Sequence, residues 1–141
     1  MATTLSRRSR VVVAASAVAI GALSVPTLAF ASSAGASTAA QSLTRGSCTG
    51  PASVTMQLQR TDRGKLEAGF EVDHARPGSI WQITLRHNGN VYFSGRRTAR
   101  HDGSFSVDRV VANRAGIDHF SGVAKSLRSG QVCSVSASTG L

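Results

Sequence analysis

Three of the chain's four histidines stand beside an aspartate, and a histidine bonded to a carboxylate is a common proton carrier in enzymes. The three pairs are Asp73-His74, His101-Asp102 and Asp118-His119. Successive side chains of a β-strand point to opposite faces of the sheet, so the members of such a pair meet only where the chain turns. His101-Asp102 lies in a predicted turn, but aspartate is common in turns for backbone reasons alone. These pairs therefore do not predict a proton-transfer site.

Other catalytic and metal-binding patterns are absent from the sequence. It has no Gly-x-Ser-x-Gly motif, and its serines are too many and too scattered to single out a nucleophile. It has no His-x-His or His-x3-His spacing, and its two cysteines stand far apart. We therefore predict a protein that is not an enzyme, with no cofactor and no metal. If it were an enzyme, we would expect a hydrolase of anionic polymers that uses His87 or His101.

Cationic and aromatic residues gather instead on one predicted hairpin and the segment after it. An exposed tyrosine offers contact area at low entropic cost, and arginine binds carboxylate or phosphate through two parallel hydrogen bonds. The alternative is that Tyr92 only covers Thr84 across the strands, which is worth less than about 1 kcal/mol. The predicted contact set is Arg86, Tyr92, Arg96, Arg97 and Arg100.

These residues are positioned by the stretch Ile80 to Phe93, which holds the only Trp, the only Tyr and a clear two-residue alternation. A two-residue turn at Asn88-Gly89 would set Leu85 opposite Tyr92 and mix apolar with polar side chains on one face. We therefore expect a three-residue loop, His87-Asn88-Gly89, with glycine in the left-handed position. This loop pairs Leu85 with Val91 and Ile83 with Phe93.

An earlier hairpin is predicted in the same way, with a three-residue loop, Asp62-Arg63-Gly64, that has glycine in the third position. Its second strand, from about Leu66 to Asp73, carries three carboxylates on its outer face, which we interpret as a solvated face. These carboxylates are Glu67, Glu71 and Asp73. The predicted cross-strand pairs are Leu58 with Ala68, Met56 with Phe70 and Val54 with Val72.

Seven short strands with frequent turns and no helical period predict an all-β fold, a single antiparallel β-sandwich. The order of hairpins favours an immunoglobulin-like or fibronectin type III-like arrangement. The immunoglobulin disulfide joins the second and sixth strands beside a core Trp, whereas Cys48 and Cys133 would join the start of the first strand to the last. A small barrel and a sandwich of different strand order remain alternatives.

Several short runs of this chain resemble small exported single-domain β proteins of high-GC Gram-positive bacteria. The runs are Phe70-Glu71-Val72-Asp73, Arg76-Pro77-Gly78, Trp81, Leu85-Arg86-His87-Asn88-Gly89, Gly103-Ser104-Phe105, Asn113-Arg114-Ala115-Gly116 and the pair Cys48 and Cys133. The resemblance covers Cys48 to Leu141 and implies export and a compact β domain. It implies no activity and no catalytic residue, because the function of these proteins is uncharacterised.

The first 31 residues are predicted to be a signal peptide, with a cationic start, an apolar segment Val11 to Leu23 and a small-x-small site that ends at Ala31. Cleavage after Ala36 and an uncleaved membrane anchor are the alternatives, and the arginine pattern leaves the Sec and twin-arginine routes open. Residues 32–47 are rich in Ser and Ala and predict a flexible tail, so that the β-sandwich domain spans 48–141.

The exported part has 13 Lys and Arg against seven Asp and Glu, a net charge of +6, and keeps both cysteines. An even pair in an oxidising compartment predicts a disulfide between Cys48 and Cys133. We expect a secreted, extracellular monomer that binds an anionic cell-wall polymer or another exported protein, with no nucleic acid partner and no membrane contact after cleavage. The alternatives are a small-molecule carrier with a cleft beside Trp81 and Phe93, and an inhibitor of a secreted hydrolase that uses the loop Asn113 to Asp118.

Overall fold

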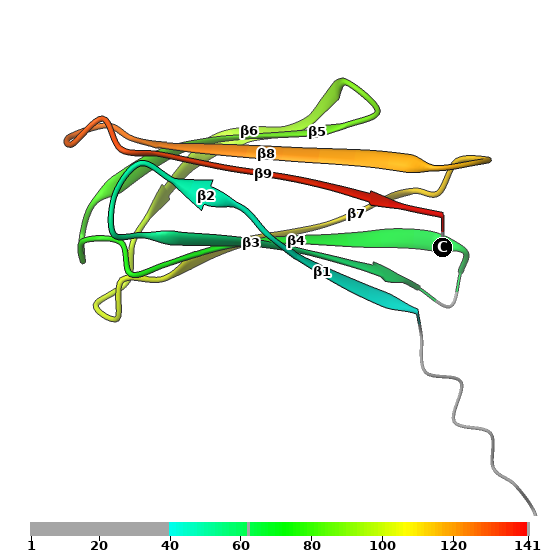
Figure 1. Ribbon diagram of the computed structural model, residues 1–141, viewed down its shortest axis with the longest axis horizontal. Helices are drawn as coiled ribbons and strands as arrows, with labels where there is room; N and C mark the ends of the chain where they lie inside the picture. Colours follow the sequence, from blue (N-terminus) through cyan, green and yellow to red (C-terminus); the bar gives the residue numbers. More distant parts are fainter. Residues whose placement is uncertain (1–39, 62, 141) are drawn as a thin grey trace, which may run out of the picture. The chain divides into compact units, whose positions relative to one another are not determined.

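The computed structural model describes residues 40–61 and 63–140, which form nine β-strands in two layers (Figure 1). The strands are β1 (Gln41–Arg45), β2 (Ser47–Cys48), β3 (Ser53–Arg60), β4 (Lys65–Asp73), β5 (Ile80–His87), β6 (Asn90–Thr98), β7 (Phe105–Ala112), β8 (Asp118–Ser126) and β9 (Val132–Thr139). One layer is a four-stranded sheet in the order β1-β3-β4-β7, and the other is a five-stranded sheet in the order β2-β9-β8-β5-β6. All neighbouring strands are antiparallel, so the predicted all-β sandwich is confirmed.

The first predicted hairpin has the expected register. Leu58 lies opposite Ala68, Met56 opposite Phe70 and Val54 opposite Val72. Gly64 ends the loop with a φ of 66°, in the left-handed region that glycine adopts without strain. Alternation and the position of one glycine were sufficient here because no bulge interrupts either strand.

The predicted turn of the β5–β6 hairpin is wrong. The chain turns through two residues, Asn88 and Gly89, whose φ angles of 48° and 81° are both left-handed, as a type I′ turn requires. His87 therefore pairs with Asn90, and a β-bulge then shifts the register so that Leu85 lies opposite Phe93. The bulge inserts one extra residue at Tyr92 and keeps apolar side chains facing each other, which removes the conflict that argued against a two-residue turn.

The β domain also begins earlier than predicted. β1 lies within the predicted flexible tail, 32–47, yet pairs with β3 over five residues, Gln41 to Arg45. Backbone hydrogen bonds to the edge of β3 hold β1, because its one large apolar side chain, Leu43, is 60% exposed. The predicted signal peptide lies outside the described residues. Within 40–61 and 63–140, no helix is long and apolar enough to cross a membrane.

Gly46 carries the chain from the four-stranded to the five-stranded sheet. A Cβ at this position would lie 2.1 Å from the carbonyl oxygen of Ser134, so a larger residue does not fit. Two residues later Cys48 lies opposite Cys133 of β9 and forms the predicted disulfide, with a Cα–Cα distance of 4.0 Å. Closing so long a loop stabilises the fold by about 4 to 5 kcal/mol in the chain-entropy account. A disulfide of this kind suggests an oxidising, extracellular environment.

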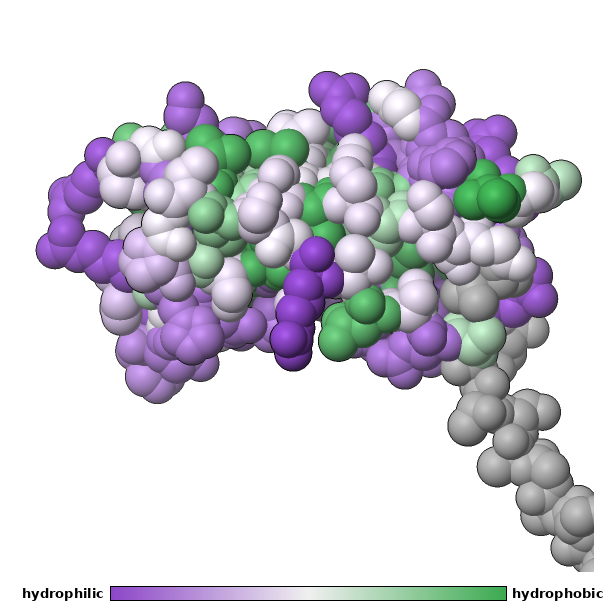
Figure 2. All heavy atoms as spheres, viewed as in Figure 1, coloured by the Kyte–Doolittle hydropathy of each residue, from purple (hydrophilic) through white to green (hydrophobic). Residues whose placement is uncertain are grey.

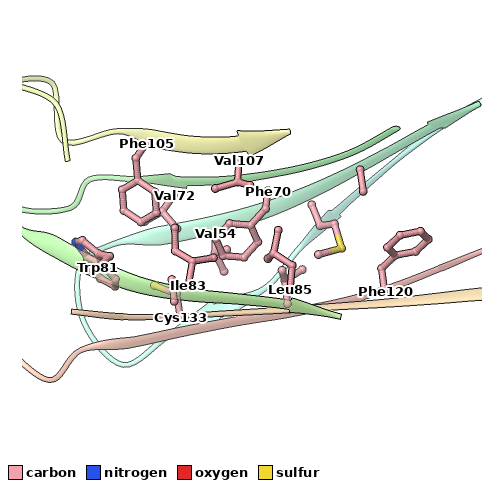
Figure 3. Close-up of a cluster of buried hydrophobic side chains, with 14 of the residues drawn as sticks. Val54, Phe70, Val72, Trp81, Ile83, Leu85, Phe105, Val107, Phe120 and Cys133 are labelled. Atoms are coloured by element: carbon pink, nitrogen blue, oxygen red, sulfur yellow. The ribbon is translucent and has the colours of Figure 1, made fainter. Parts of the chain in front are cut away.

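The core lies between the two layers, where apolar side chains from both sheets interdigitate (Figure 3). Trp81 of β5 and Phe105 of β7 meet from opposite sheets, with ring centroids 5.6 Å apart. Each fully buried side chain of this size contributes about 1.5 to 3 kcal/mol. The largest fully buried apolar members are Trp81, Phe70, Phe120, Met56, Leu58, Leu66, Ile83, Leu85, Val54, Val72 and Val107. Apolar side chains thus occupy most inward positions. Most polar side chains that could bind a ligand lie on the two outer faces and in the loops.

Gly122 of β8 provides the first test. A Cβ at this inward position would lie 2.6 Å from two atoms of the Phe70 ring and 3.0 Å from Leu85, so Gly122→Ala forces the sheets apart. We expect a loss of about 1 to 3 kcal/mol in the free energy of unfolding, measured by urea denaturation. The control is Gly140→Ala, whose Cβ would meet nothing within 4 Å. Equal stability of the two variants would contradict this packing.

Candidate functional site

Three cations lie on the outward face of the five-stranded sheet. Gln82 of β5 lies opposite Arg96 of β6 on one side and opposite Lys125 of β8 on the other. Neighbouring strands are about 4.8 Å apart, so Arg96 and Lys125 are roughly 10 Å apart, and Arg86 lies roughly 13 Å further along β5. All three cations are exposed. We call the surface of Arg86, Arg96 and Lys125 the basic face.

Hydroxyl groups fill most of the space around these cations. The outward positions of β9 are all serines except Val132, and His119 of β8 is hydrogen-bonded through Nδ1 to Oγ of Ser138 at 2.8 Å. Val123, 44% exposed, and Val91, 49% exposed and opposite Arg86, are large apolar side chains on the same face. The outward hydroxyl residues are Thr84, Ser94, Thr98, Ser121, Ser134, Ser136 and Ser138. Hydroxyl and guanidinium groups are both donors, so the face suits a ligand rich in oxygen acceptors.

No carboxylate among the described residues shares the basic face. Asp118 is buried between the sheets and Asp102 lies in the β6–β7 loop. The other described carboxylates lie on the outward face of the four-stranded sheet, namely Glu67, Glu71, Asp73 and Asp108. Arg86 and Arg96 are held only by neutral acceptors, the Gly89 carbonyl at 3.3 Å and the Gln82 side-chain oxygen at 3.4 Å. The outward face of the four-stranded sheet thus carries these carboxylates together with the cations Lys65 and Arg45, whereas the basic face carries described cations and no described carboxylate.

We call the outward face of the four-stranded sheet, with Glu67, Glu71, Asp73 and Asp108, the acidic face. It has a shallow hollow of about 230 Å³, part of which lies where Gly69 has no side chain. Burial is the main cause that raises the pKa of Glu71, and the nearby charges of Asp73 and Asp108 raise it further. The charge of Arg100 opposes this shift. No group of three or more His, Cys, Asp or Glu side chains in the described chain is arranged to hold a metal ion. The carboxylates that alternate along β4 therefore repel one another, as expected for a solvated face.

The predicted contact set does not form one patch. Arg86 and Arg96 lie on the basic face, whereas Arg100 lies beyond β6 and hydrogen-bonds to Ser104 at 3.4 Å. Tyr92 is half-buried against the core, with its ring edge-on to Phe120 at 6.2 Å. Its hydroxyl is buried without a hydrogen-bond partner among the described residues, and burial raises the pKa of Tyr92 to about 12. The bulge at Tyr92 turns this side chain inward, so the prediction that it lies outward between two arginines is wrong.

Arg97 also faces inward, at the edge where β6 and β7 close the sandwich. Its guanidinium carbon lies 5.1 Å from the centre of the Phe93 ring, and that of Arg109 from β7 lies 4.8 Å from the same centre. Such cation–π contacts are worth about 0.5 to 1 kcal/mol at exposed sites. Charged side chains that point inward from edge strands also discourage pairing with another chain. The structure therefore gives Arg97 a role at the edge of the sandwich.

A buried His–Asp pair is the feature that sequence reasoning missed. Nε2 of His87 donates to Oδ1 of Asp118 at 2.6 Å, and both side chains are buried. Asn88 donates to the same oxygen at 2.8 Å, and the backbone N–H of Arg114 donates to Oδ2 at 3.1 Å. His87 also stacks on Phe120, with ring centroids 4.4 Å apart. The partners are 31 positions apart in the sequence, so no local pattern reveals this pair.

This network fixes the loop between β7 and β8 and offers no surface for chemistry. Asp118, the last residue of the predicted inhibitory loop, is 1% exposed, and Ile117 beside it is 65% exposed. Burial raises the pKa of Asp118, but the hydrogen bonds from Arg114, His87 and Asn88 outweigh burial and hold it below its ordinary value. The pair is buried and joins β5 to β8 and to the loop before β8, so we assign it a structural role.

Comparison of the chain with protein-family models, with curated proteins and with solved structures found no match.

Asp118→Asn tests the network. The lowered pKa means that the carboxylate stabilises the fold above about pH 4 and that this contribution is lost as pH falls through the folded-state pKa. We expect the variant to lose about 1 to 3 kcal/mol at pH 7, and the difference from the parent to shrink below pH 4. Urea denaturation between pH 3 and pH 7 measures this, with the exposed Asp108→Asn as control. A difference that does not depend on pH would contradict the assignment.

Proposed function

We propose that this chain is an exported, monomeric, non-enzymatic binding module that attaches to an anionic cell-wall polymer through the basic face. The observation that carries the proposal is the sorting of charge. Arg86, Arg96 and Lys125 share one outward face with no described carboxylate, whereas four carboxylates lie on the opposite face. A basic composition without a binding role does not require this separation, because cations and carboxylates on one face would stabilise each other.

The strand order supports an immunoglobulin-like or fibronectin type III-like assignment. The neighbours β3-β4-β7 and β9-β8-β5-β6 have the connectivity of strands A-B-E and G-F-C-C′ of such domains, with β1 and β2 added at one edge. The disulfide between Cys48 and Cys133 supports export, because such bonds persist in oxidising compartments. Both features agree with a secreted domain whose N-terminal segment directs export.

A phosphate-rich polymer fits the chemistry of this face. Arginine binds a phosphate through two hydrogen bonds, and the surrounding hydroxyls donate further ones. Arg96 and Lys125 are level with Gln82 and Arg86 lies roughly 13 Å further along β5, so the three cations form a triangle and a flexible polymer that bends over β5 would meet all three. On the side of the molecule shown in Figure 2, the hydrophobic areas are divided by residues of intermediate hydropathy, and hydrophilic residues lie around them, so this side has no continuous apolar surface.

The test is sedimentation of the purified mature protein with isolated cell walls, intact or stripped of anionic polymers, at low and high salt. The variant is the triple change Arg86→Gln, Arg96→Gln and Lys125→Gln. Its affinity for intact walls should fall at least about tenfold at low salt, and its salt dependence should weaken, because each lost phosphate contact removes counterion release. Stripped walls should bind neither protein.

The matched control removes the same charge from elsewhere on the domain. Arg45→Gln, Arg63→Gln and Lys65→Gln also delete two arginines and one lysine, all exposed and none on the basic face. Equal loss of binding in both triple variants would assign binding to net charge and overturn the proposal. Binding to stripped walls would point to an exported protein as the partner.

A further inference from the structure

A cavity lies at one end of the sandwich, where the loop after β4 meets the turn between β8 and β9. Its volume is about 430 Å³, within the range of about 300 to 1,000 Å³ usual for small-molecule sites. A second cavity of about 60 Å³ shares Arg76, Ser79 and Arg128 with the first and is also lined by Trp81. A cleft shared by Trp81 and Phe93, as predicted for a carrier, is not found at these two cavities, because Trp81 lines only the smaller one and Phe93 lines neither.

Two cations line both cavities without a counter-ion. Arg76 and Arg128 are exposed, and no ion pair joins either guanidinium to a described carboxylate. The acidic side chains of the described chain are committed to the acidic face, the β6–β7 loop or the buried pair with His87. A ligand with a negative group would therefore find two unpaired arginines here.

The walls between these arginines are apolar. Ile80 is 45% exposed and Leu127 is 49% exposed, and both line the larger cavity together with Pro77. The smaller cavity is lined by Gln131, whose side-chain amide nitrogen is buried with no hydrogen-bond partner among the described residues. Burying a hydrogen-bond donor without a partner costs free energy, so this amide favours a ligand whose acceptor atom reaches the smaller cavity.

Hydrogen bonds hold the frame of this site in place. The Trp81 indole N–H donates to Oγ of Ser79 at 2.8 Å, and that hydroxyl donates to the carbonyl oxygen of Arg76. The backbone N–H of Leu127 donates to the carbonyl of Ile80 at 2.9 Å, which joins the two walls. A preformed site loses little conformational entropy when a ligand binds.

From these features we propose that the end cavity binds a small amphipathic anion, a single carboxylate or phosphate group on an apolar body. The anionic group lies between Arg76 and Arg128, and the apolar body lies on Ile80 and Leu127. The cavity borders the basic face, since Ile80 and Leu127 lie two positions from Gln82 and Lys125, but Arg86, Arg96 and Lys125 do not line it. Different variants therefore test the two proposals.

Trp81 is the only tryptophan, so its fluorescence reports directly on this site. The mature protein is titrated with octanoate, octyl phosphate and the uncharged octanamide. We expect saturable changes with both anions and at least about tenfold weaker binding of the amide. Whichever anion binds more tightly identifies the carboxylate or the phosphate as the preferred group.

The variant Arg76→Gln with Arg128→Gln should weaken binding of both anions at least about tenfold and leave the amide unchanged. The charge-matched control, Arg86→Gln with Arg96→Gln on the basic face, should bind as the parent does. All four arginines are exposed, so we expect both double variants to fold as the parent does. No saturable change up to about 10 mM anion, or equal affinity for anion and amide, would overturn the proposal.

Discussion

The Phe70 ring of β4 packs directly against Gly122 of the opposite sheet, and this contact constrains the packing of the core. A Cβ on Gly122 would lie 2.6 Å from that ring, so the two sheets pack as they do only with no side chain at this point of β8. Close approach buries the aromatic and aliphatic side chains of both inner faces together (Figure 3). Interiors packed this tightly tolerate little change in volume. A residue that weakens a strand by propensity is therefore essential to the core.

This constraint determines where function can reside. The inner faces are used for packing, and the inward arginines of β6 and β7 close the open edge over Phe93. The outer faces and the loops remain, and both proposed sites are there. On the outer faces, Arg86, Arg96 and Lys125 share one sheet without a described carboxylate, and the carboxylates of β4 and β7 lie on the other sheet with Lys65 and Arg45.

Much of the fold could be predicted from the sequence because alternation and glycine-bearing loops act locally. The β3–β4 register follows from Gly64 alone, whereas the bulge at Tyr92 is a tertiary compromise that keeps Phe93 opposite Leu85. Two of the three cations of the basic face, Arg86 and Arg96, were predicted because they share one hairpin. Lys125 was missed because its place beside Gln82 depends on the pairing of β5 with β8, which lies far along the chain. Long-range pairing is likewise what brings His87 to its buried carboxylate.

The central claim is that the basic face binds an anionic polymer. The most direct measurement is a titration of isotope-labelled mature protein with poly(glycerol phosphate), followed by amide chemical shifts in NMR spectra. The account predicts that shifts concentrate on the outward residues of β5, β6 and β8, around Arg86, Arg96 and Lys125, and disappear in high salt. Shifts on the acidic face, or spread evenly over the surface, would contradict it.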